Sequence, residues 1–104
     1  MSNSDTTLDK VYRKTDGVIA RHIAGELLLV PVSGRVADLQ RIYSLDSVPA
    51  FIWDRLDGAK ALDAIRDEIV AAYEVEPDSA AADLLAFVRE LADSALVEPA
   101  AEAP

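Results

Sequence analysis

The stretch that decides the fold reads Val18-Ile19-Ala20-Arg21-His22-Ile23-Ala24-Gly25-Glu26-Leu27-Leu28-Leu29-Val30. It contains two runs rich in aliphatic residues, and the dipeptide Ala24-Gly25 separates them. Two such runs joined by a two-residue turn that ends in glycine are typical of a β-hairpin. Pro31 follows the second run and ends it, because proline has no N–H to donate to a sheet.

A third strand is predicted on the C-terminal side of this hairpin, over residues 40–45. Side chains alternate between the two faces of a strand, so Tyr43 and Leu45 share one face while Ile42 and Ser44 lie on the other. We expect Tyr43 and Leu45 to face the core. Ile42 is then an apolar residue on the outer face of a strand at the edge of the sheet.

The period of the apolar residues becomes helical after residue 45. The first predicted helix begins at Asp46 or Ser47 and ends before Asp57-Gly58, where the glycine suits a left-handed C-cap. The second spans residues 61–73, where apolar residues recur on one helical face. The third follows Asp78 as its N-cap and runs to about residue 94, and Leu96-Val97 is a final short strand.

This order of elements predicts an α+β domain of winged-helix-like character, with a three-stranded antiparallel β-sheet followed by three α-helices. Three short helices after a small sheet have to pack together against one face of it. We expect the domain to span residues 11–97, between a flexible N-terminal arm (1–10) and a flexible tail (98–104), because both ends lack apolar periodicity.

Composition excludes several classes of protein. The chain has no cysteine, which rules out disulfides and thiolate metal ligands, and no run approaches the about 20 apolar residues that a membrane helix needs. The first residues lack the pattern of a signal peptide, so we expect a cytoplasmic protein without membrane contact.

Candidate catalytic groups are few. His22 is the only histidine and lies on a predicted strand, so no second histidine or cysteine can share a metal with it. The acidic pairs, such as Asp63 and Asp67, are typical of solvated helix faces, and no glycine-rich phosphate loop is present. The sequence therefore predicts a protein that is not an enzyme, with no metal and no cofactor.

Charge bears on the alternative function that a winged-helix shape suggests, a DNA-binding regulator. The chain carries 10 Lys and Arg against 19 Asp and Glu, and 14 of the acidic residues follow residue 45. In such a regulator the third helix would enter the major groove of DNA. Here this helix has a single basic residue, Arg89, and four acidic residues. Phosphate contacts require positive charge, so nucleic acid is not an expected partner. An acidic surface can instead attract basic peptide segments.

The apolar residues exceed what one small core requires. Ile42 stands on the outer face of a predicted edge strand, whose unpaired amides can accept an added peptide strand. The third helix is apolar over much of its circumference, through Leu84, Leu85, Phe87 and Val88. Strand and helix could flank a peptide groove, or these residues could simply complete the core. Trp53 is expected in the core.

Several short motifs, in this order and spacing, resemble the PqqD-like family. They are Asp16-Gly17-Val18, Gly25-Glu26 with the apolar run that follows, Leu45-Asp46 leading to Ile52-Trp53, Leu56-Asp57-Gly58, and Phe87-Val88-x-x-Leu91 with Leu96-Val97. Members of this family include pyrroloquinoline quinone biosynthesis protein D and recognition elements for ribosomally made, modified peptides.

The resemblance implies a non-catalytic peptide chaperone. Family members bind the leader of a precursor peptide as a strand beside the third strand and against the third helix, and present it to a modifying enzyme, often a radical S-adenosylmethionine protein. This places Arg41, Ile42, Tyr43 and Ser44 on the strand that pairs with the peptide, and Leu84, Leu85, Phe87 and Val88 on the groove side of the helix. The same open edge leads us to expect a homodimer.

Overall fold

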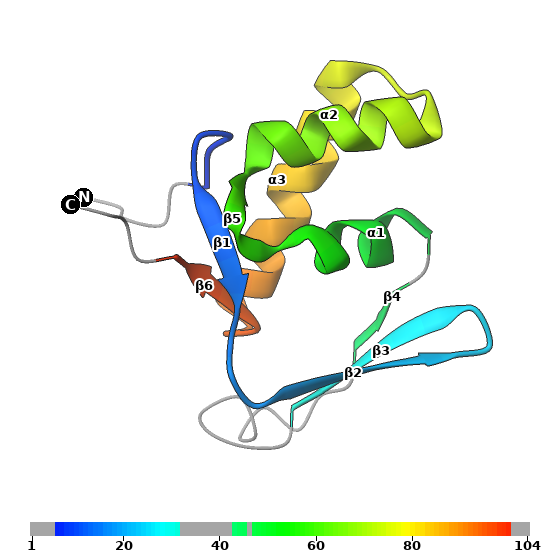
Figure 1. Cartoon of the computed structure of the whole chain (residues 1–104), viewed down its shortest axis with the longest axis vertical. Helices are drawn as coiled ribbons and strands as arrows, with labels where there is room; N and C mark the ends of the chain where they lie inside the picture. Colours follow the sequence, from blue (N-terminus) through cyan, green and yellow to red (C-terminus); the bar gives the residue numbers. More distant parts are fainter. Residues whose placement is uncertain (1–5, 32–42, 46, 101–104) are drawn as a thin grey trace.

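The structure, a computed structural model, describes residues 6–31, 43–45 and 47–100 (Figure 1). Its strands are β1 (Val11–Lys14), β2 (Val18–Ile23), β3 (Glu26–Pro31), β4 (Tyr43–Leu45), β5 (Asp57–Ala61) and β6 (Val97–Pro99). Its helices are α1 (Ser47–Arg55), α2 (Leu62–Tyr73) and α3 (Pro77–Asp93). The molecule is α+β, as the sequence predicts, but it has two small antiparallel sheets where one was expected.

The predicted hairpin forms one side of the first sheet, whose strand order is β2-β3-β4. Ala24 and Gly25 connect β2 to β3 with φ angles of 52° and 84°. Two consecutive positive φ angles are the signature of a type I′ turn, whose twist matches that of the strands it joins. Strand β4 pairs with β3, Leu45 lying opposite Leu27, so this part of the predicted sheet is confirmed.

The second sheet, with strand order β5-β1-β6, was not predicted apart from its last strand. Gly58 was predicted to be the C-cap of the first helix, and this prediction is wrong. Helix α1 ends at Arg55, and Gly58 lies inside β5 with a φ of 81°. The register between β1 and β5 is irregular at this point, and a Cβ on Gly58 would lie 3.3 Å from the Cβ of Arg13. Glycine is needed here for its backbone angle and for the close approach of the two strands.

The three helices lie within two residues of their predicted bounds, with one difference at the start of α3. Pro77 is the first residue of α3 and Glu76 is its N-cap, so Asp78 lies in the first turn instead of capping it. Proline is favoured at this position because the first N–H of a helix has no intrahelical partner. Helix α3 packs against α2, and the hairpin of β2 and β3 runs below α1, which β3 contacts (Figure 1).

One hydrophobic core joins the helices to both sheets, and Trp53 belongs to it as predicted, with 2% of its surface exposed. Helix α3 contributes Ala80, Leu84, Val88 and Leu91, which recur on one helical face. The core therefore holds one side of α3 and leaves its two flanks and its outer side for other contacts.

Contacts with the fold extend beyond the predicted domain limits at both ends. Thr6 is buried and its hydroxyl shares a hydrogen bond of 3.2 Å with that of Tyr12, although residues 1–10 were predicted to be a mobile arm. The carbonyl of Leu8 accepts a hydrogen bond from the N–H of Asp63 in the first turn of α2. At the other end, Glu98 lies in β6 and pairs with Arg13 of β1, although residue 98 was assigned to the flexible tail.

Candidate functional site

Strand β4 is the edge of its sheet among the described strands, because it pairs with β3 on one side only. Leu45 is buried, Tyr43 is partly buried and Ser44 is exposed, which confirms the predicted alternation of faces for these three residues. The Ser44 hydroxyl donates to the Glu26 carboxylate across the outer face, at 2.6 Å. An edge strand offers backbone N–H and C=O groups to a further strand.

Helix α3 meets β4 at its C-terminal end. Asp83, Phe87, Glu90 and Ser94 follow one another at intervals of four, three and four residues, so they form a single row along the helix. We call this row the α3 stripe. Ser94, the C-cap residue, shares a hydrogen bond with the hydroxyl of Tyr43 in β4. That hydrogen bond fixes the C-terminal end of the α3 stripe beside the edge strand.

The predicted groove residues of the helix separate into two groups. Leu84 and Val88 are both 0% exposed and belong to the core, so their side chains do not line an open surface. Leu85 and Phe87 are partly buried at the margin of the core. Phe87 is seven residues from Ser94 and lies on the same flank, whereas Leu85 is nine residues away and lies on the opposite side of the helix. Of the four, Phe87 is brought toward β4.

The predicted strand residues are only partly within the described structure. Arg41 and Ile42 lie outside the described residues. Tyr43 is joined to Ser94 and Ser44 to Glu26, as given above. The structure thus brings Tyr43 and Phe87 to the same side of α3, and the assignment of these residues to peptide binding stays a prediction.

A small pocket opens near the other end of the α3 stripe, where sequence reasoning did not expect one. Its volume is about 120 Å³, and it is lined by Val48, Ile52, Ile69, Val75, Ser79, Ala80 and Asp83. The small side chains of Ser79 and Ala80 leave room between α3 and the apolar residues of α1 and α2. One signal was available in the sequence, since Val75 is an apolar residue that stands alone between Glu74 and Glu76. The structure leaves its side chain 37% exposed.

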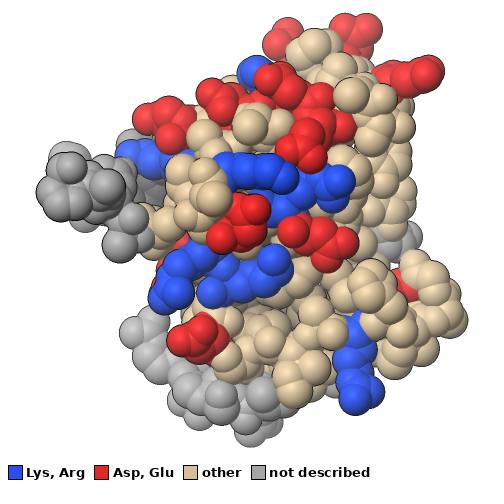
Figure 2. Space-filling view, viewed as in Figure 1, with Lys and Arg blue, Asp and Glu red and all other residues tan. Residues whose placement is uncertain are grey.

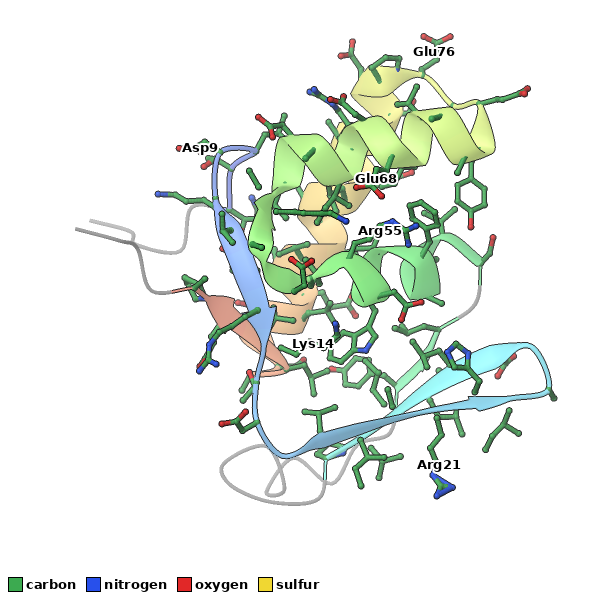
Figure 3. The ribbon with its side chains drawn as sticks, in the orientation of Figure 1. Asp9, Lys14, Arg21, Arg55, Glu68 and Glu76 are labelled. Atoms are coloured by element: carbon green, nitrogen blue, oxygen red, sulfur yellow. The ribbon has the colours of Figure 1, made fainter. Side chains whose placement is uncertain are left out.

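Charged side chains are paired on the opposite face, which β1, β5, α1 and α2 form. Figure 2 shows Lys and Arg interleaved with Asp and Glu over this face. Arg55 donates to Glu68 at 2.6 Å, and Lys60 lies 3.3 Å from the same carboxylate. The hydrogen bond from Arg55 lowers the pKa of Glu68, and Figure 3 shows the two side chains meeting between α1 and α2.

Helix α3 differs from this face because its charged side chains are not paired with other described residues. It carries five charged residues, Asp78, Asp83, Arg89, Glu90 and Asp93. None of them forms an ion pair with another described residue, although the described residues contain four ion pairs elsewhere. Four of these five side chains are negative, which agrees with the charge that the sequence assigned to this helix.

Lys14 is a partly buried cation in β1. Burial lowers the pKa of its ammonium group. The ammonium donates to the carbonyl of Leu56 at 3.3 Å and lies 5.3 Å from the ring centre of Trp53 (Figure 3). A perturbed lysine can mark a reactive site. Here the same neighbours account for a packing role, since the side chain covers Trp53.

The part of the chain that the structure describes contains neither a cluster of metal-ligating side chains nor a helix that could span a membrane. Among these residues, no three His, Asp or Glu side chains gather in an arrangement that could hold a metal ion. Within the same residues, no helix has the length and apolar character needed to cross a membrane.

Comparison with known proteins identifies relatives of this fold. The chain is similar over 86% of its length to TbiB1, solved in complex with the TbiA(beta) leader peptide, with 31% identity, 99% of that chain covered and a TM-score of 0.71. It shares its fold with lasso peptide synthetase B1, complexed with the leader peptide, at 19% identity over 85% of this chain and 98% of that one, with a TM-score of 0.72.

A search of curated proteins found no match. The family model for coenzyme PQQ synthesis protein D (PqqD) matches residues 26–97, a segment that runs from β3 through the α3 stripe to the start of β6. The resemblance seen in the sequence is thereby confirmed, and the chain belongs to the PqqD family.

Proposed function

We propose that this protein binds the leader of a ribosomally made precursor peptide, which adds as a strand at the edge that β4 forms among the described strands and lies against the α3 stripe. The observation that carries the proposal is that the edge strand β4 is joined to the C-terminal end of the α3 stripe by the hydrogen bond between Tyr43 and Ser94. Backbone pairing at an edge supplies affinity, and pockets for alternate side chains supply selectivity.

Two further observations support this function. TbiB1, which is 31% identical to this chain, was solved with a leader peptide bound to it. The pocket beside Asp83 is largely apolar and open, as a subsite for one peptide side chain should be. The alternative of a DNA-binding regulator has no comparable support, because the charges on α3 are mostly negative.

In this proposal the protein is a chaperone and does no chemistry itself. It acts in the cytoplasm, where ribosomes release the precursor, and presents the bound peptide to a separate modifying enzyme. A radical S-adenosylmethionine protein is the kind of enzyme that the family resemblance favours. The product would be a modified peptide or a cofactor made from one, such as pyrroloquinoline quinone.

Direct binding tests the proposal. The N-terminal segments of short reading frames encoded beside this chain would be synthesised with a fluorescent label and titrated with the protein. We expect one of them to bind with a Kd of about 1 µM or tighter, as measured by anisotropy. A scrambled peptide of the same composition is the control. The proposal is wrong if no segment binds saturably and a random-peptide library also yields no binder.

The position of β4 at the edge of the described sheet has a second consequence, which is pairing between two copies of the chain. One row of amides cannot pair twice, so a homodimer formed through β4 and a bound leader would exclude each other. Sedimentation velocity over a range of protein concentrations should show a dimer that the peptide converts to a monomer. A dimer that persists at saturating peptide would show that the two copies meet through another surface.

A further inference from the structure

Asp83 stands apart from the other residues of the α3 pocket. Of the seven residues that line it, Asp83 alone is charged, and its side chain is exposed to solvent. No described residue pairs with its carboxylate. The pocket therefore combines an apolar cavity with a free negative charge at its rim.

Glu90 is a second carboxylate, further along the α3 stripe, that is unpaired among the described residues. It follows Asp83 by seven residues, which places the two about 10 Å apart along the helix axis, with Phe87 between them. Glu90 also has no ion-pair partner among the described residues. The α3 stripe thus alternates two free carboxylates with an aromatic side chain and with Ser94, which is held by Tyr43.

We propose that Asp83, assisted by Glu90, selects a basic segment of the leader peptide, one in which Lys or Arg stands next to the apolar side chain that enters the pocket. This inference rests on the proposed function and names the chemistry of its ligand. An apolar side chain in the pocket displaces water from the rim, which strengthens the attraction between Asp83 and a neighbouring cation. An acidic neighbour would be repelled at the same place, so the pair discriminates between leaders.

The spacing of the two carboxylates adds a prediction about the peptide sequence. An extended peptide rises about 3.3 Å per residue, so about three residues cover the distance from Asp83 to Glu90. Side chains that face one side of a strand are two or four positions apart, and Lys and Arg are long enough to adjust. We expect the preferred leaders to carry two basic residues separated by two to four positions.

A random library of 12-residue peptides, displayed and panned on the full chain at low salt, tests this inference without knowledge of the natural precursor. Pools from the wild-type chain should be enriched in Lys or Arg within two positions of an aliphatic or aromatic residue. Asp83→Lys should shift the enrichment to Asp and Glu, because the sign of the rim is reversed. Asp78→Lys is the matched control, since Asp78 is exposed on the same helix but lies off the α3 stripe.

Affinity gives an independent readout. A basic peptide selected by the wild-type chain should bind Asp83→Asn about twofold to fivefold more weakly, the range of an exposed ion pair, and the difference should disappear at high salt. Pools with the same basic content for the wild type and for Asp83→Lys would overturn the inference while leaving leader binding intact. If the wild-type chain enriches no peptide at all, the proposed function fails and this inference fails with it.

Discussion

Replacing Val88 by aspartate is expected to unfold the protein. Val88 is 0% exposed and lies in the core on the buried face of α3. The substitution removes apolar burial and places a carboxyl group where no partner can reach it, at a cost of about 4 kcal/mol or more. Small domains are stable by only about 5–15 kcal/mol, so most of the folded population should be lost. Circular dichroism during thermal melting measures the effect.

Arg89→Asp is the matched control for Val88→Asp. It introduces the same side chain one position further along α3, at an exposed residue without an ion pair to another described residue. Its melting temperature should stay close to that of the wild-type chain. A cooperative transition of Val88→Asp near the wild-type temperature would mean that this part of α3 is not packed as the structure describes. Val88 is therefore a site for testing the fold and not the peptide groove.

Replacing Phe87 by alanine is expected to weaken leader binding about tenfold, whereas the same change at Leu85 should leave it nearly unchanged. Both residues lie on α3 at the margin of the core and are partly buried. Phe87 belongs to the α3 stripe beside β4, and Leu85 points to the opposite side of the helix. A bound peptide would cover apolar surface on Phe87 only, and the loss of about 1.5 kcal/mol corresponds to the factor of ten.

The comparison should use the peptide that binds the wild-type chain most tightly by anisotropy. Melting temperatures of both variants, measured first, ensure that each is folded at the temperature of the titration. Equal losses at Leu85 and Phe87 would indicate a general effect of helix stability. A loss at Leu85 alone would place the peptide on the other flank of α3 and would contradict the site proposed here.

The sequence by itself determined the elements whose pattern is local. The dipeptide Ala24-Gly25 between two aliphatic runs was enough to predict the hairpin, because its glycine suits the positive φ angle that such a turn requires. Apolar spacing located all three helices, and alternation assigned Tyr43 and Leu45 to the inner face of β4. The motifs that resemble the PqqD-like family were also readable, and the family followed from them.

The tertiary structure alone decided features that depend on residues far apart in the chain. The sheet of β5, β1 and β6 joins three short segments that are far apart in the sequence. The local sequence around Gly58 predicts the end of a helix, and only the tertiary structure shows that Arg13 lies beside this glycine in a sheet. Helical spacing showed that α3 is apolar, but only the bond from Ser94 to Tyr43 tells which flank faces β4. The side of α3 that faces β4 depends on contacts between residues far apart in the chain, and such contacts leave no periodic pattern in the local sequence. The core position of Val88 and the pocket beside Asp83 were settled in the same way, by packing between elements.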